Sequence, residues 1–265
     1  MHFVRQGRGA PPLVFVHGFL CSHEDWRRQV EFFSKTHEVV ACDLRGHGET
    51  PGRPHECSIE HYGGDVAALV NNLELANPIL VGHSMGCRVV LEANRIAPKR
   101  VGGIVLVDGS RFGTGDADAA EAAARAQIEQ TGYAAWAEDL FRQMFFQSTP
   151  ATERLVARAV RQSAEIGAAL WPRSVRWDAA TLETALAAVQ APVLVIQTTT
   201  RDPQSGKRGP LKAGQSTPYL ELLKEKLKDV RIEILPGLGH FPQLEAPARV
   251  NELVDSFLSE MRQSE

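Results

Sequence analysis

The segment most able to do chemistry is residues 82–86, Gly-His-Ser-Met-Gly, where a serine lies close to a glycine on each side. A serine nucleophile has to project from a sharp turn, and nearby glycines let neighbouring backbone pass close to it. The pattern is short and also arises by chance, so its setting matters. An apolar run at residues 79–81 precedes it and a helical pattern follows from Met85. These features predict that Ser84 is a nucleophile at a strand-to-helix turn.

The base that would activate Ser84 is identified by elimination among the histidines. A serine hydroxyl becomes an effective nucleophile when an imidazole takes its proton, and in sheets with this turn the histidine follows the serine in the chain. Eight of the nine histidines precede Ser84, and His240 alone follows it. His240 lies in the glycine-rich segment 236–241, after the last apolar run. We therefore expect His240 and Ser84 at the same carboxyl edge of the sheet.

Two backbone N–H groups are expected to stabilise the oxyanion that forms when Ser84 attacks a carbonyl. Met85 would supply one of them, because it directly follows the nucleophile at the start of a helix. Phe19 would supply the other, because it comes shortly after the first strongly apolar run at residues 13–16. His17, in the same loop, is expected to be structural.

These residues are set in a repeated alternation of strands and helices. Short, continuously apolar runs are typical of buried parallel strands, and they occur at residues 13–16, 39–42, 79–81, 104–107, 193–196 and 232–235. Helical spacing of apolar residues lies between them, and Ser58 and Thr217 are candidate N-caps. The alternation predicts an α/β fold with a mostly parallel, doubly wound sheet. Residues near His2 are expected to add one further strand.

Residues 111–190 interrupt the alternation, because they contain no convincing strand. An alanine-rich stretch at 117–130 comes first, and helical patterns with many large apolar side chains follow, namely Trp136, Phe141, Met144, Phe145, Phe146, Trp171 and Trp177. We predict a helical lid inserted between two strands. It would divide one structural unit into core residues 1–110, lid residues 111–190 and core residues 191–265. The aromatic side chains would form the core of the lid or line an apolar pocket.

Four motifs resemble those of serine hydrolases with the α/β-hydrolase fold, in the group of small esterases, lactonases and C–C hydrolases. They are residues 17–19 (HGF), 43–48 (DLRGHG), 82–86 (GHSMG) and 239–241 (GHF), and they follow the family order. Together they span most of the chain outside the predicted lid. The resemblance implies a Ser-His-acid triad, whereas segment 43–48 shapes a turn in this family and is not implied to be catalytic.

The resemblance places the acid of the triad shortly after the strand that follows the lid. Asp202 is the nearest acidic residue there, although a threonine run at residues 198–200 replaces the usual glycine-acid turn of the family. Some family members instead carry the acid after an earlier strand, and Asp108 occupies that position here. We expect Asp202 to be the acid, and Asp108 is the alternative.

The activity implied is hydrolysis of a carboxylic ester or lactone through an acyl-enzyme. The same triad would serve a C–C bond hydrolase, an amidase, an acyltransferase or a perhydrolase, and resembling receptors keep it with slow turnover. We expect no metal and no cofactor, because the sequence lacks metal-ligand spacing and nucleotide-binding loops. The expected partner is a small apolar or aromatic ester-like molecule. The basic residues between Arg201 and Lys212 would be a solvated loop or would meet a substrate carboxylate.

Composition narrows the class of protein further. The chain has 265 residues, a net charge of -3 and 43% hydrophobic residues, which is typical of a globular unit. A net charge this close to zero does not indicate a basic surface for binding nucleic acid. No apolar run approaches the roughly 18 residues of a membrane span. The four cysteines show no paired spacing, so we expect buried thiols and a cytoplasmic location. The sequence carries no signal for the number of subunits.

Overall fold

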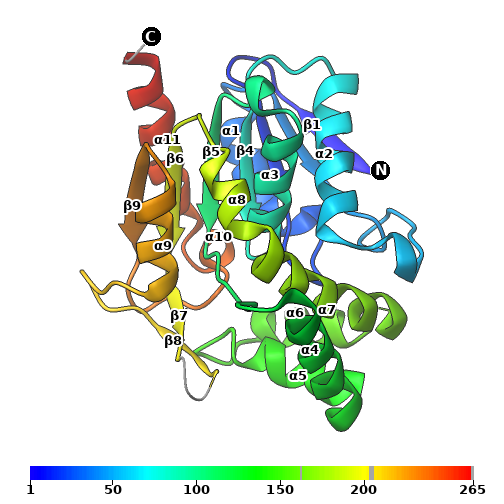
Figure 1. Cartoon of the computed structure of the whole chain (residues 1–265). Coiled ribbons are helices and arrows are strands. Elements are labelled where there is room, and N and C mark those ends of the chain that lie inside the picture. Colours follow the sequence, from blue (N-terminus) through cyan, green and yellow to red (C-terminus); the bar gives the residue numbers. More distant parts are fainter. Residues whose placement is uncertain (162, 203–205, 264–265) are drawn as a thin grey trace.

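The fold is built on one central sheet, as the computed structural model in Figure 1 shows; it describes residues 1–161, 163–202 and 206–263. The strands of this sheet are β1 (Phe3–Gln6), β2 (Leu13–Val16), β3 (Val39–Cys42), β4 (Ile79–His83), β5 (Gly103–Val107), β6 (Val193–Gln197) and β9 (Val230–Ile234). Their order is β1-β3-β2-β4-β5-β6-β9. β1 runs antiparallel to β3, and the remaining neighbours are parallel. The predicted mostly parallel sheet is confirmed.

The predicted strands coincide with the observed ones because their apolar runs fill the centre of the sheet. All residues of β2 to β6 are buried, as strands covered on both faces should be. β9 is an edge strand whose residues are only partly buried. There the apolar run at 232–235 locates the strand, but the strand begins earlier, at Val230.

Helices cover both faces of the sheet. The helices of one face are α1 (Arg27–Phe33), α10 (Pro242–Glu245) and α11 (Pro247–Gln263), and those of the other are α2 (Ile59–Asn72), α3 (Met85–Ile96), α8 (Leu182–Ala187) and α9 (Pro218–Lys226). The two predicted N-caps are confirmed. Ser58 Oγ accepts the N–H of His61, and Thr217 Oγ1 accepts that of Leu220.

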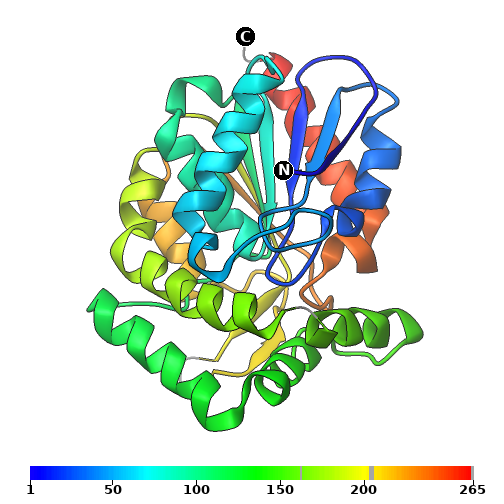
Figure 2. The same ribbon diagram turned by 90° about the vertical axis from the view of Figure 1, so that its right-hand side faces the viewer.

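A bundle of helices joins β5 to β6, and we call α4 to α7 the helical segment. Its members are α4 (Ala117–Thr131), α5 (Tyr133–Arg142), α6 (Pro150–Arg161) and α7 (Ala164–Ala180). Figure 2 shows them lying across the end of the sheet where the parallel strands finish. Within residues 111–161 and 163–190 the structure contains helices and turns but no strand. α8 is not part of the helical segment, because it packs beside α3 on a face of the sheet.

Two ion pairs fasten the helical segment to the rest of the molecule. Arg88 of α3 donates two hydrogen bonds to the Asp178 carboxylate of α7, each 2.7 Å long, and both side chains are buried. Arg158 of α6 donates two hydrogen bonds to Asp25, at 2.8 and 2.6 Å. Bidentate pairs of this kind hold the orientation of both partners. These two pairs therefore fix the position of the helical segment relative to α3 and to the residues just before α1.

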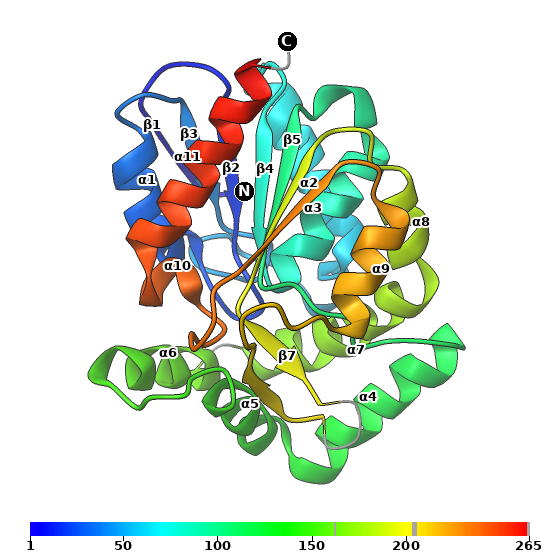
Figure 3. The same cartoon turned by 90° about the vertical axis from the view of Figure 1, so that its left-hand side faces the viewer.

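A small hairpin follows β6 where the sequence predicts a loop. Its strands are β7 (Thr199–Arg201) and β8 (Arg208–Pro210), which pair antiparallel. Figure 3 shows it near α4 and α5, at the same end of the sheet as the helical segment. Thr199 and Thr200 suit a strand because of their β-branched side chains. The hairpin brings its two arginines, Arg201 and Arg208, toward the carboxyl edge of the sheet.

The four cysteines are buried and free, as expected from their spacing. None of the described helices combines the length and apolar character that a membrane span requires.

Candidate active site

Ser84 occupies the sharp turn between β4 and α3. Its φ is +53°, a backbone conformation that residues other than glycine rarely adopt and that often marks a functional site. A Cβ on Gly82 would collide with the carbonyl oxygen of Gly86, and one on Gly86 would collide with the carbonyl oxygen of Val16. Glycine is therefore required at position 82 because the turn folds tightly on itself, and at position 86 because the turn passes close to β2.

His240 lies beside Ser84, as the chain order predicts. The His240 Nε2 and Ser84 Oγ atoms are 2.8 Å apart, and the imidazole is fully buried. Its backbone is fixed on two sides. Its N–H donates to the carbonyl of Met144 at 2.8 Å, and its own carbonyl accepts from Nε2 of His83 at 2.7 Å. The imidazole is thus held in position to take the hydroxyl proton of Ser84.

The carboxylate next to His240 belongs to Asp108, and the expectation of Asp202 is wrong. His240 Nδ1 and Asp108 Oδ2 are 2.5 Å apart. Asp108 directly follows β5, which lies next to β4, so its carboxylate stays at the edge of the sheet that carries Ser84. β7 carries Asp202 away from that edge. Asp202 is exposed in the hairpin, where its N–H donates to the carbonyl of Lys207.

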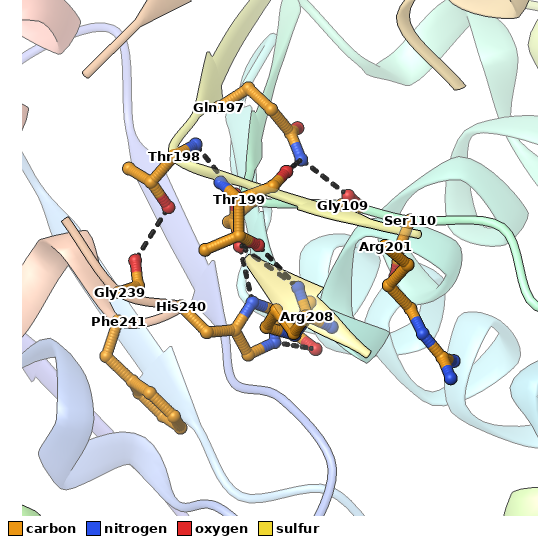
Figure 4. Close-up of polar contacts among 12 residues, drawn as sticks. Gly109, Ser110, Gln197, Thr198, Thr199, Arg201, Arg208, Gly239, His240 and Phe241 are labelled. Carbon is orange, nitrogen blue, oxygen red and sulfur yellow. Dashed lines mark hydrogen bonds and ion pairs between the residues drawn. The ribbon is translucent and has the colours of Figure 1, made fainter. Parts of the chain in front are cut away.

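The threonines after β6 hold the Asp108 carboxylate. The N–H groups of Thr198 and Thr199 donate to Oδ1 at 2.7 and 2.8 Å, and the Thr199 hydroxyl donates to Oδ2 at 2.5 Å. Figure 4 shows Thr198, Thr199 and the nearby Arg208, whose Nη1 is 3.4 Å from Asp108 Oδ2. Burial by itself would raise the pKa of Asp108. The His240, Arg208 and Thr199 groups outweigh burial and lower this pKa to about 2.

The pKa of His240 is also displaced. Burial and the positive charge of Arg208 lower it to about 4, although the Asp108 carboxylate acts in the opposite direction. The imidazole is therefore neutral at pH 7. A neutral imidazole whose Nδ1–H donates to a carboxylate has a free lone pair on Nε2, which is the state that a general base requires.

Phe19 and Met85 lie beside Ser84, where the sequence places the oxyanion donors. Both line the triad cavity, which we define as the cavity that also contains Ser84 and Arg208. Met85 is the first residue of α3, so its N–H has no acceptor within the helix. The triad cavity measures about 10 Å³, which is room for a single water molecule at most.

Two larger cavities adjoin the triad cavity, because Phe112 lines all three. The hairpin cavity, of about 470 Å³, lies against β7 and β8 and is lined by Arg201 and Arg208. The outer cavity, of about 530 Å³, is lined by Trp136, Trp171 and Arg201. Sequence reasoning missed Phe112, and it noted the two arginines only as members of a basic loop.

The aromatic side chains of the helical segment divide between cavity walls and core. The Trp171 ring lies 5.5 Å from that of Phe19, 5.2 Å from that of Trp136 and 4.7 Å from that of Phe112. Trp177 instead packs inward and donates to Glu92. Trp171 and its neighbours therefore form an apolar wall beside Ser84.

One group of described residues has the donor types of a metal site, namely His2, His23 and Asp43. Its members lie far apart in the sequence, so spacing did not reveal it. Both imidazole Nδ1 atoms lie within 3.0 Å of the Asp43 carboxylate, which also accepts the N–H groups of His23 and Glu49. These hydrogen bonds give the cluster a structural role, since they tie the chain around β1 to the turn after β3.

Comparison with known proteins identifies the family of this chain. The profile of the Alpha/beta hydrolase family matches residues 13–253. A non-heme chloroperoxidase of Burkholderia pyrrocinia is 40% identical over 80 residues, which are 30% of this chain and 29% of the relative. A bifunctional esterase/perhydrolase of Acinetobacter calcoaceticus is 42% identical over 80 residues, with the same two shares. The matched segment thus spans less than a third of each of these two relatives.

Solved structures share the whole fold. A thermophilic esterase from Thermogutta terrifontis superposes with a TM-score of 0.79 and 24% identity, over 98% of this chain and 93% of the other. The enol-lactonase from Burkholderia xenovorans gives a TM-score of 0.78 and 22% identity, over 97% and 96% of the two chains. Because the family profile covers nearly the whole chain and the fold agrees with it, this protein belongs to the alpha/beta hydrolase family.

Proposed function

We propose that the protein is a serine hydrolase that cleaves a carboxylic ester or lactone through an acyl-enzyme. The observation that carries this proposal is the continuous hydrogen-bonded chain from Ser84 through His240 to Asp108. A serine, an imidazole and a carboxylate in this order form the arrangement that activates a hydroxyl for acyl transfer.

The reaction would proceed in two steps. His240 Nε2 takes the proton of Ser84 as Oγ attacks the substrate carbonyl, and the N–H groups of Phe19 and Met85 stabilise the oxyanion. Asp108 stabilises the imidazolium, which then protonates the leaving alcohol. In the second step His240 activates a water molecule, which attacks the acyl-enzyme and releases the acid and Ser84.

The substrate would be a small molecule with an apolar or aromatic portion. The protein itself would be located in the cytoplasm. The apolar wall formed by Phe19, Phe112, Trp136 and Trp171 supports the first part of this proposal. The four buried free thiols support the second. Structural neighbours named as esterase and enol-lactonase favour oxygen esters over amides.

Perhydrolase activity is a second candidate, because one relative is named a bifunctional esterase/perhydrolase. Hydrogen peroxide would then replace water in the second step and release a peracid from the same acyl-enzyme. The two activities share Ser84 and differ only in the second nucleophile. Adding peroxide to a hydrolysis assay and measuring peracid distinguishes them.

The central experiment measures hydrolysis of p-nitrophenyl esters, lactones and amides by the wild type and by Ser84→Ala. We expect the alanine variant to lose at least about 10³-fold in kcat, because no nucleophile remains. Ser259→Ala, which removes an exposed hydroxyl on α11, is the matched control and should retain full activity. Unchanged hydrolysis in Ser84→Ala would refute the proposal. Labelling of Ser84 without steady-state release would instead indicate a slow-turnover receptor.

A further inference from the structure

The hairpin after β6 presents two arginines to the cavities around Ser84. The Arg208 side chain is only 4% exposed and lines both the triad cavity and the hairpin cavity. Arg201 lies over the Phe112 ring at 4.6 Å and lines the hairpin and outer cavities. In Figure 4 Arg208 lies next to the His240 ring, and Arg201 lies farther from that ring. At least one of these two guanidinium groups therefore lines each of the three cavities.

The charge of Arg208 is only partly balanced by the carboxylates around it. Arg88, the other arginine of the triad cavity, forms a close bidentate pair with Asp178 at 2.7 Å. Arg208 is 3.4 Å from Asp108, whose nearer partner is His240 at 2.5 Å. The Nη1 group of Arg208 donates chiefly to the Thr199 hydroxyl, a neutral acceptor. Arg208 therefore shares the carboxylate of its ion pair with an imidazole, and a further anion beside this buried cation would stabilise it.

The electrostatics of both arginines favour the binding of an anion. Burial lowers the pKa of Arg208 to about 10, although the Asp108 carboxylate acts in the opposite direction; the positive charges of Arg201 and Arg88 lower it further. Burial and the charge of Arg88 also lower the pKa of Arg201. The Arg88 and Arg201 guanidinium groups lie over the Phe112 ring, and Arg208 lines the triad cavity and the hairpin cavity. The wall of the hairpin cavity also contains Arg111 and Asp202. A bound carboxylate would relieve the mutual repulsion of Arg88, Arg201 and Arg208.

We infer that the acyl part of the substrate carries a second carboxylate, which Arg208 binds and Arg201 attracts. This inference rests on the proposed function and names its substrate class, namely esters or lactones of short dicarboxylic acids. A guanidinium matches a carboxylate with paired N–H groups. The chain between the two carbonyl carbons has to be short, because Arg208 and Ser84 line the same small cavity. The alcohol portion remains free to contact the apolar wall.

The test compares mono-p-nitrophenyl glutarate with p-nitrophenyl valerate, which has an acyl chain of equal length without the carboxylate. We expect the wild type to have a kcat/KM at least about 10-fold higher for the glutarate ester, the range of a charge-assisted hydrogen bond. Arg208→Gln should reduce this ratio to about one, and Arg208→Lys should retain part of it. Because the ratio compares two substrates on one variant, a general loss of triad function cancels.

Arg201→Gln provides a second variant that leaves the contacts to Asp108 and Thr199 intact. Arg201→Gln should lower the ratio of the two kcat/KM values by raising KM for the glutarate ester. If circular dichroism shows that Arg208→Gln does not fold, Arg201→Gln alone tests the inference. Lys212→Gln, which removes an exposed positive charge from the segment after the hairpin, is the matched control and should leave the ratio unchanged.

The outcomes separate the inference from the proposed function. Ser84-dependent hydrolysis with equal rates on both esters, and no change of ratio in Arg208→Gln or Arg201→Gln, would overturn the inference and leave the proposed function standing. Hydrolysis that persists in Ser84→Ala would overturn the proposed function instead. Calorimetric titration with glutarate then still tests the site, because the wild type should bind it more tightly than Arg208→Gln does.

Discussion

At the scale of single residues, the site depends on two side chains whose backbone adopts an uncommon conformation. Ser84 and Asp108 both have positive φ, at +53° and +45°, and each directly follows a buried parallel strand. Such conformations are unfavourable for residues with a Cβ and persist where the surrounding structure holds them. Here the hydrogen bonds to Asp108 and the close packing around Ser84 do so. The two strands thus aim both groups at His240.

Replacing Asp108 by asparagine and replacing Asp202 by asparagine should have very different effects on kcat. Asp108→Asn should reduce kcat by about 10⁴-fold, because an amide favours the wrong tautomer of the imidazole and does not stabilise the imidazolium. Asp202→Asn should retain nearly full kcat, since Asp202 lies in the exposed part of the hairpin. Steady-state kinetics of both variants check this. A large loss in Asp202→Asn with normal turnover in Asp108→Asn would contradict the geometry.

The pH dependence of kcat/KM follows from His240. The general base must be neutral, and the His240 pKa in the folded protein is about 4, below its ordinary value of 6.5. Activity should therefore be fully present at neutral pH and should fall as the pH drops through about 4. Arg208→Gln removes a positive charge and should move this limb to higher pH. A wild-type limb near pH 6.5 would contradict the assignment.

At the scale of elements, the ion pair between α3 and α7 connects the helix that follows Ser84 to the helical segment. Arg88 and Asp178 are both buried, and Asp178 also accepts the N–H of Phe112 at 2.7 Å. One carboxylate therefore positions the cavity wall and compensates Arg88. The site is assembled by contacts between helices that are distant in the chain.

Removing one partner of this pair should be strongly destabilising. Asp178→Leu should lower the free energy of unfolding by about 3–5 kcal/mol, because it leaves a buried guanidinium without its anion. The double variant Arg88→Met/Asp178→Leu should be less destabilised than Asp178→Leu alone. Urea denaturation measures both. Glu252→Gln breaks the exposed pair with Arg249 and should change stability by less than about 1 kcal/mol.

At the scale of the whole molecule, the helical segment and the sheet share one apolar core. The cluster on one face of the sheet includes strand residues such as Val14 and Leu106 and segment residues such as Phe141 and Trp171. Shared burial of this extent makes folding cooperative. The helical segment should therefore unfold together with the sheet, although it lies at one end of it (Figure 2).

The Trp26→Phe variant allows the unfolding of the helical segment to be measured by tryptophan fluorescence. Of the four tryptophans, Trp26 alone lies outside the helical segment, so fluorescence of the variant reports only on Trp136, Trp171 and Trp177. Denaturation followed by this fluorescence and by far-UV circular dichroism should give one midpoint. Two separate midpoints would show that the helical segment unfolds by itself.

The sequence by itself determined the strands of the central sheet and identified Ser84 and His240, two members of the proposed triad. Buried parallel strands are continuously apolar, so their positions are visible in runs such as Leu13–Val16. Ser84 is marked by its glycines, and His240 by its place after all other histidines. These properties depend on the order of residues in the chain, and no knowledge of spatial neighbours is needed to find them.

Only the tertiary structure decided which carboxylate lies beside His240 and which arginines line the cavities. Asp108 is 132 positions from His240, and the threonine donors that hold it come from the adjacent strand. The choice between Asp108 and Asp202 depends on which strands are neighbours and on where β7 leaves the edge of the sheet. Arg208 is likewise an ordinary basic residue until the hairpin buries it beside Ser84. Chemistry at the edge of a parallel sheet combines the ends of several strands, and their adjacency is a property of the folded sheet.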